Sequence, residues 1–308
     1  MSSGRLAFAL AACAALFAAS GAEAGPLRGG DKGLTHHELA SGGMMRSYEM
    51  HRPDGVKGAS PLVIMLHGGG GSGKNGVKMT GFNDLADAEG FTVVYPDGTS
   101  KRGPFLTWNA GHCCASAMER DVDDVGFLSD LIDDLVAKGI ADPKRVYVTG
   151  MSNGAMMTHR AGRELPGKIA AIAPVVGAMF GDEPMTAAPV PALIITGAKD
   201  AHVPAAGGNG QFNRRMDPPN DVPFGPADVA FRYWSAGNHC QGEAPSKETG
   251  TYTLRSGANC AAPVRWYSIT EGGHAWPGGR KGSRRGDAPV TDFDASEVIW
   301  DFFKSQHR

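Results

Sequence analysis

The chain has 308 residues, with 30 Lys and Arg against 32 Asp and Glu, which gives a formal net charge of −2. This balance carries no electrostatic footprint for nucleic acid, so nucleic-acid binding is excluded as the expected function. The length is enough to bury a large core and is typical of one α/β domain with insertions.

The first 24 residues have the pattern of a secretory signal peptide. Arg5 precedes the apolar run LAFALAACAALFAA, which is too short to span a bilayer, and Ala22-Glu23-Ala24 follows as an A-x-A cleavage site. We therefore expect cleavage after Ala24, no membrane segment in the mature chain, and a periplasmic or secreted protein. The alternative is a lipoprotein, because Cys13 follows Leu-Ala-Ala in a lipobox-like run.

The predicted elements then alternate along the chain. Buried strands are expected where apolar runs end at turns, and helices where apolar residues recur every three or four positions. The predicted strands are 45–53, 61–68, 91–98, 145–150 and three more around residues 169, 192 and 265. The predicted helices are 81–90, 123–139, 153–165 and a last one near the C-terminus with Asp292 or Asp294 at its N-cap.

Strands that alternate with helices predict a mostly parallel sheet with helices on both faces. Residues 25–308 are expected to form one domain of this α/β class. The stretch 207–225 is rich in Gly, Pro and Asn without periodicity, and we interpret it as an irregular excursion from the sheet.

Ser152 lies in the stretch VTGMSNGAMM, between Gly150 and Gly154. A predicted strand precedes this G-x-S-x-G pattern and a predicted helix follows it, which is the context of a nucleophile elbow. The glycines allow the sharp turn, and the start of the helix offers free amides near the serine hydroxyl. The alternative is an ordinary strand-to-helix turn in which the serine is only an N-cap.

Two further residues follow in the chain order of an α/β-hydrolase. Asp200 comes directly after the apolar run PALIITG, and His274 lies in a glycine-rich loop after the last strand. Ser152, Asp200 and His274 are therefore the candidate nucleophile, acid and base. Asp200 as a simple turn residue is the alternative. His202 lies two residues beyond Asp200 and is a candidate for lining a substrate pocket.

The strand at 61–68 leads into His67-Gly68-Gly69-Gly70-Gly71, a loop suited to binding an oxyanion through its backbone amides. The amide of Asn153 is the second expected donor. Phosphate binding is the alternative, but Lys74 is followed by Asn75 where a P-loop has Ser or Thr. This chemistry requires no metal and no organic cofactor.

Four cysteines remain after the predicted cleavage, an even number that favours two disulfides in an exported protein. A bridge between Cys240 and Cys260 would close a surface hairpin or loop. By elimination, Cys113 and Cys114 would pair with each other. Zinc is set aside because the spacing lacks a repeated C-x2-C with matching histidines.

Taken together, these motifs resemble the polyhydroxybutyrate-depolymerase-type esterases, a group with feruloyl and acetylxylan esterases, over about residues 46–303. The motifs are LHGGGGSG, WNAG before the paired cysteines, DDVGFL, VYVTGMSNGAMM, GAKDAHVP and GGHAWPGG. The resemblance implies an α/β-hydrolase fold, Ser152, Asp200 and His274 as the triad, and Gly69 and Asn153 as oxyanion donors.

The same resemblance places Trp108, Asn109 and Trp276 near the acyl pocket. Many relatives carry a cysteine in the loop after His-Gly, where this chain has glycines. The expected activity is hydrolysis of carboxylic esters through an acyl-enzyme. With no serine/threonine-rich linker to a polymer-binding module, we expect plant cell-wall esters of the feruloyl or acetylxylan type as substrates.

Three alternatives remain at this point. A short-chain polyhydroxybutyrate depolymerase would use the same catalytic residues, and an exported peptidase could use the same fold. A non-catalytic carbohydrate-binding or adhesion protein on this fold would belong to a different functional class.

Overall fold

The computed structural model describes Met1 and residues 33–211, 222–283 and 286–308. The predicted signal peptide, its cleavage after Ala24 and the alternative lipidation of Cys13 lie outside these residues. Within the described ranges, every helix is too short or too polar to cross a membrane.

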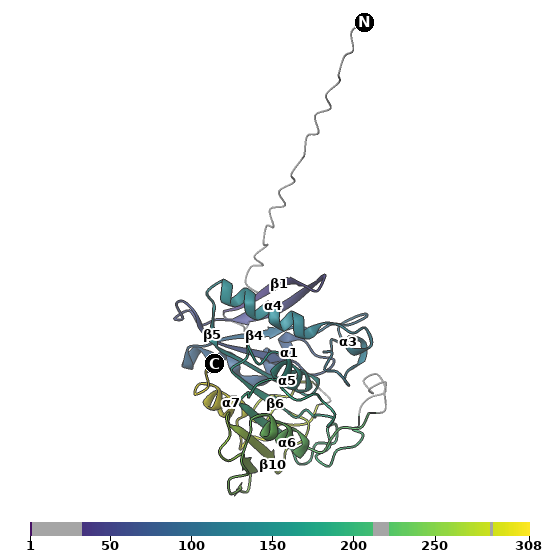
Figure 1. The fold of residues 1–308 in the computed structure, drawn as a ribbon, viewed down its shortest axis with the longest axis vertical. Helices are drawn as coiled ribbons and strands as arrows, with labels where there is room; N and C mark the ends of the chain where they lie inside the picture. The colour runs from purple at the N-terminus through teal and green to yellow at the C-terminus, as the bar shows by residue number, and fades with distance from the viewer. Residues whose placement is uncertain (2–32, 212–221, 284–285) are drawn as a thin grey trace.

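The described strands form one ten-stranded sheet (Figure 1). Its central strands are parallel, and antiparallel strands extend it at both edges. In spatial order the strands are β1 (Leu34–Ser41), β2 (Met44–His51), β4 (Thr92–Pro96), β3 (Ser60–Leu66), β5 (Ala141–Met151), β6 (Ala171–Val175), β7 (Ala192–Gly197), β10 (Val264–Ile269), β9 (Tyr252–Ser256) and β8 (Lys247–Glu248).

Helices cover both faces of this sheet, because alternate side chains of each central strand point to opposite sides. On β3, Leu62, Ile64 and Leu66 belong to one buried cluster, whereas Val63 and Met65 belong to another. The helices packed on the first cluster are α4 (Asp124–Ala137), α5 (Asn153–Glu164) and α6 (Asp228–Gly237). Those packed on the second are α1 (Gly73–Thr80), α2 (Phe82–Glu89) and α7 (Ala295–Phe303).

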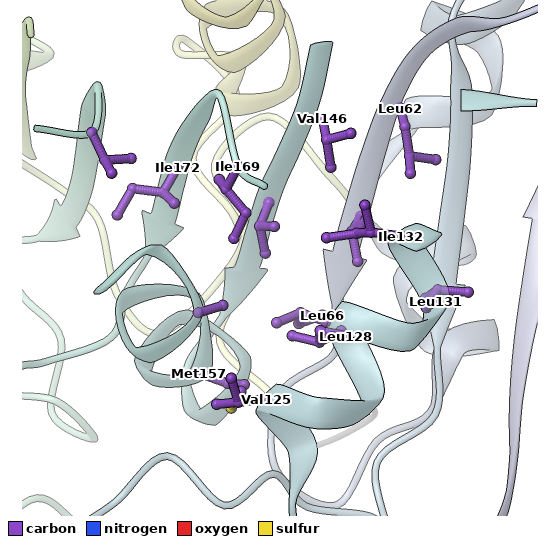
Figure 2. Packing of buried hydrophobic residues seen from close by; sticks show 14 of the residues in the cluster. Leu62, Leu66, Val125, Leu128, Leu131, Ile132, Val146, Met157, Ile169 and Ile172 are labelled. Carbon is purple, nitrogen blue, oxygen red and sulfur yellow. The ribbon is translucent and has the colours of Figure 1, made fainter. Parts of the chain in front are cut away.

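Figure 2 shows the first cluster, in which α4 and α5 lie against the sheet. Leu128 and Ile132 of α4 are one turn apart, and both belong to the same buried cluster as Met157 of α5. Leu66 is the last residue of β3, so this packing fixes the end of the strand from which the loop 67–71 departs. The core therefore positions the edge of the sheet where the candidate residues lie.

The predicted fold class is confirmed: the sheet is mostly parallel and helices cover both of its faces. Each predicted strand and helix has its counterpart, and the last helix has Asp294 as its N-cap, which accepts from the amides of Ser296 and Glu297. The prediction omitted several elements that the structure contains, namely β1, β8, β9, α1, α6 and the short α3 (Ala115–Glu119).

Two surface segments are closed by long-range pairing. The ends of the irregular excursion meet at an antiparallel bridge between Gly208 and Phe224, and its residues 212–221 lie outside the described ranges. A disulfide joins Cys240 to Cys260, and the antiparallel strands β8 and β9 lie between them as a hairpin.

Candidate active site

The carboxyl ends of three parallel strands bring the candidate triad together. Ser152 follows β5, Asp200 lies just beyond β7, and His274 lies beyond β10. The Ser152 hydroxyl donates to His274 Nε2 at 2.8 Å, and His274 Nδ1 donates to Asp200 Oδ2 at 2.8 Å. This chain of hydrogen bonds leaves Nε2 able to accept the serine proton, which is the arrangement required of a general base.

Ser152 has the backbone of a sharp strand-to-helix turn, with φ 57° and ψ −122°. A Cβ at Gly150 would lie 2.5 Å from the carbonyl oxygen of Gly154, and one at Gly154 would overlap the carbonyl oxygen of Leu66. Only glycine fits at either position, so both glycines of the pattern have a steric role. The turn presents the serine hydroxyl at the edge of the sheet and is costly for a residue with a side chain.

Asp200 is buried, and each of its carboxylate oxygens has defined partners. Oδ2 accepts from His274, whereas Oδ1 accepts from the backbone amides of His202 and Val203, both at 2.8 Å. The three donors fix the orientation of the carboxylate. Asp200 is therefore set to orient the histidine and to stabilise its imidazolium.

His274 is also held through its backbone, by a residue that the sequence analysis did not identify. Its amide donates to Asp287 Oδ2 at 2.7 Å. Asp287 is the last residue of the basic sequence RKGSRRGD. The sequence offers no local signal for this contact, since the two residues are 13 positions apart in irregular structure.

The loop 67–71 leaves two backbone amides for an oxyanion. The amide of Gly70 donates to Leu106 O at 2.7 Å, and the amide of Gly71 donates to Gly68 O at 3.0 Å. Within the described part of the chain, the amides of Gly68 and Gly69 have no such acceptor. A Cβ at Gly68 would lie 3.4 Å from the Cβ of Ser152, so this end of the loop lies against the candidate nucleophile.

His67 holds this loop from inside the protein. Its Nδ1 donates to Gly68 O at 2.8 Å, and its Nε2 accepts from the amide of Gly98 at 3.0 Å. Burial lowers the pKa of His67 to about 4, so the ring is neutral near pH 7 and can accept from Gly98. His67 is therefore a structural support of the loop.

The side chain of Asn153 fastens a second loop to the elbow. Its Oδ1 accepts from the amide of Trp108 at 2.8 Å, and its Nδ2 donates to Trp108 O at 3.0 Å. The indole nitrogen of Trp108 in turn donates to His67 O at 3.0 Å. The backbone amide of Asn153 lies at the start of α5, where the first amides of a helix have no intrahelical acceptor and can serve as oxyanion donors.

Trp108, Asn109 and Trp276, the residues expected near the acyl pocket, have buried side chains in the structure. The two indoles are 0% exposed and Asn109 is 3% exposed. The Trp276 indole packs edge-to-face on Phe82 and donates to Ser296 Oγ at 3.0 Å. Asn109 Nδ2 donates to Val122 O at 3.0 Å. All three side chains are used in the interior, where large aromatic rings contribute most to packing.

His202 lies next to the triad, as expected from its place two residues after Asp200. Its ring stacks on the ring of His274, with centroids 4.8 Å apart and planes inclined by 28°. Both rings are partly exposed. Of the residues predicted to bind substrate, His202 is therefore the one whose side chain contacts the candidate triad.

A small apolar cluster lies on the elements that carry the triad. Met156 is one turn after Ser152 in α5, and Val203 is the residue whose amide binds Asp200. Cys113 belongs to the same cluster, is joined to Cys114 by a disulfide, and has its Sγ 3.9 Å from Asn153 Nδ2. Phe180 packs on the cluster and is partly exposed. Met156 and Val203 are themselves buried, so the solvent-facing apolar surface on this side comes from partly exposed members such as Phe180.

Comparison with known proteins gives one family and several relatives. The family described as "Esterase PHB depolymerase" matches residues 46–208. The chain is 32% identical to feruloyl esterase B of Piromyces equi over 75% of this chain and 42% of that protein. It is 27% identical to the poly(3-hydroxybutyrate) depolymerase of Ralstonia pickettii over 97% of this chain and 66% of that protein. The chain thus spans less than two thirds of the length of either relative.

Among solved structures, the acetyl xylan esterase from Aspergillus awamori superposes with a TM-score of 0.57 and 13% identity. The superposition covers 88% of this chain and 99% of that one. At this identity the likeness shows the fold alone.

Proposed function

The chain belongs to the PHB depolymerase family of esterases, and we propose that it hydrolyses carboxylic esters through a covalent acyl-enzyme on Ser152. The observation that carries the proposal is the hydrogen-bond chain from Ser152 through His274 to Asp200. A serine hydroxyl is a weak nucleophile on its own, and this chain supplies the adjacent base that activates it.

In the first step, His274 Nε2 takes the hydroxyl proton while Ser152 Oγ attacks the ester carbonyl. The negative charge on the carbonyl oxygen is held by the amides of Gly69 and Asn153. His274 then gives its proton to the leaving alcohol, and the acyl group stays on Ser152. In the second step, His274 takes a proton from water, which attacks the acyl-enzyme and frees the acid.

We propose plant cell-wall esters of the feruloyl or acetylxylan type as the substrate class. Similarity to a feruloyl esterase supports this class, although the chain spans less than half of that relative. The partly exposed ring of Phe180 beside the triad also supports it, because an aromatic acyl group gains from burial against apolar side chains.

A short-chain polyhydroxybutyrate depolymerase is the second candidate. Similarity to such a depolymerase over 97% of this chain favours it. Both candidates use the same triad, so the substrate alone distinguishes them. For either one, the N-terminal pattern supports export and the two cysteine pairs support an oxidising compartment.

The test compares initial rates of wild type and Ser152→Ala on methyl ferulate, acetylated xylan, a hydroxybutyrate oligomer and p-nitrophenyl acetate. We expect wild type to prefer methyl ferulate or acetylated xylan, and Ser152→Ala to be inactive on all four. Preference for the hydroxybutyrate oligomer would replace the cell-wall assignment by the depolymerase. Equal rates for the two proteins on every ester would overturn the serine mechanism, and failure to react with a fluorophosphonate would favour a non-catalytic protein.

A further inference from the structure

One metal-ligating side chain that ester hydrolysis does not need, His202, lies beside Asp200 and His274 of the candidate triad. Asp200, His202 and His274 each offer a ligand atom, and the three atoms all lie within 4.8 Å of one another. Across residues 33–211, 222–283 and 286–308, this is the single group of its kind. Asp200 is buried and the two histidines are partly exposed. The cluster therefore has one ligand in the interior and two that solvent can reach.

Two imidazoles and a carboxylate form a donor set that suits Zn²⁺, which binds such ligands in a tetrahedron completed by water. Zinc–ligand bonds of about 2.0–2.2 Å place the ligand atoms of a tetrahedral site roughly 3.3 Å apart. His274 Nδ1 and Asp200 Oδ2 are already 2.8 Å apart, so a small separation would admit the ion. The ligand atom of His202 lies within 4.8 Å of the other two, so its ring has to move closer to reach that spacing.

We propose that Asp200, His202 and His274 form an inhibitory site for Zn²⁺. As an inhibitory site it rests on the proposed ester hydrolysis, although binding of the ion itself does not. The ion occupies the position of the proton between His274 Nδ1 and Asp200. His274 stays neutral by carrying its proton on Nε2 instead, so Nε2 now donates to Ser152 and cannot accept the serine proton. Hydrolysis stops without any covalent change.

His202 is the residue that distinguishes this proposal from ordinary triad geometry. The closeness of Asp200 and His274 follows from general-base catalysis, and one imidazole with one carboxylate is a weak zinc site. The second imidazole, stacked 4.8 Å from the first, completes the three protein ligands found in open zinc sites. Removing it should therefore weaken zinc binding strongly while leaving the Asp200–His274 pair in place.

The first experiment measures hydrolysis of p-nitrophenyl acetate by untagged protein over a ZnCl₂ series. Each rate is divided by the metal-free rate of the same variant. Loss of even an outer partner of a zinc ligand costs about 10- to 100-fold in affinity, so we expect His202→Gln to need at least ~10-fold more zinc for half-inhibition than wild type. EDTA should restore the wild-type rate. Mg²⁺ should not inhibit, because it prefers oxygen ligands.

The matched control is His36→Gln. His36 Nδ1 lies 3.1 Å from the carboxylate of Glu49, a histidine–carboxylate pair on β1 and β2 and not part of the triad. Its replacement should leave half-inhibition by zinc unchanged. Equal zinc sensitivity of His202→Gln and wild type, or no inhibition of wild type by micromolar zinc, would overturn the proposed site.

The second experiment measures zinc binding by calorimetry in the Ser152→Ala background, where no hydrolysis is needed. We expect one Zn²⁺ per chain, and binding at least ~10-fold weaker when His202→Gln is added. Zinc binding with this dependence in a protein that hydrolyses no ester would overturn the proposed function alone. An active esterase whose Ser152→Ala variant binds no zinc would overturn the zinc site alone.

Discussion

Replacing Asp200 by Asn tests how the acid controls the histidine. In the folded protein, Oδ1 of Asp200 accepts from two backbone amides and Oδ2 accepts from His274. An asparagine side chain has a carbonyl oxygen that accepts and an NH₂ group that donates, so the two backbone amides determine which of them faces His274. Its oxygen must face the amides of His202 and Val203, which leaves its NH₂ group facing His274.

The size of this preference follows from the two hydrogen bonds that the backbone amides of His202 and Val203 donate to residue 200. The opposite orientation loses two hydrogen bonds worth about 1 kcal/mol each and brings donors face to face, so it is disfavoured by at least roughly 2 kcal/mol, or about 30-fold. The NH₂ group then donates to His274 Nδ1, and the ring carries its proton on Nε2. A ring in this state cannot take the proton of Ser152. The same replacement in a serine protease lowers kcat about 10⁴-fold, and we expect a loss of this order here.

The assay is kcat/KM on p-nitrophenyl acetate, with Asp287→Asn as the matched control. Asp287 also accepts from His274, but only from its backbone amide, and an asparagine oxygen can replace that contact. The lost charge costs about 1 kcal/mol, or roughly fivefold in rate. A kcat/KM for Asp200→Asn within tenfold of wild type, or equal to that of Asp287→Asn, would refute the reasoning.

Two further predictions concern stability. Asn153→Ala leaves the buried amide of Trp108 without an acceptor and removes a second hydrogen bond, so the free energy of unfolding in urea should fall by about 2–4 kcal/mol. A loss below about 0.5 kcal/mol would contradict this role for the side chain. Burial lowers the pKa of His67 to about 4 and the pKa of His159 to about 3. Between those values and about pH 6.5, each of these histidines therefore binds a proton in the unfolded chain but not in the folded chain. Stability should therefore fall by roughly 1.4 kcal/mol per pH unit for each histidine as the pH drops below 6.5. His159→Gln should make this decline shallower by that amount, and an unchanged slope would show that His159 does not stay neutral in the folded protein.

The positions of Ser152, Asp200 and His274 could be predicted because each depends on local sequence. Each follows an apolar run that forms a parallel strand, and parallel strands end at the same edge of a sheet. Gly150 and Gly154 add a steric requirement that is visible in the sequence. The order of the three residues then limits the fold to few alternatives.

The positions of Trp108 and Trp276 in the interior could not be predicted in the same way. Both lie in irregular segments, where no periodicity indicates which side is buried. Their partners, His67 for one and Ser296 for the other, are 41 and 20 residues away. A tryptophan near a catalytic residue in sequence is therefore a poor guide to its exposure.

The elements missed by the sequence analysis have weak patterns for physical reasons. β1 is an edge strand, and its central residues are polar: His36 and His37 are partly exposed and Glu38 is exposed. α1 begins just after the glycine-rich loop 67–71, and a Cβ at its Gly73 would overlap the carbonyl oxygen of Tyr95. Its glycines are required by this close approach, although they lower its helix propensity.

The central claim is that Ser152 is a nucleophile activated by His274, and covalent trapping tests it most directly. Wild type, Ser152→Ala and His274→Ala are treated with a fluorophosphonate, and the modified residue is located by mass spectrometry of the digested protein. We expect one adduct on Ser152 in wild type, none in Ser152→Ala and much slower labelling in His274→Ala. Labelling of another residue at an undiminished rate in Ser152→Ala would contradict the account.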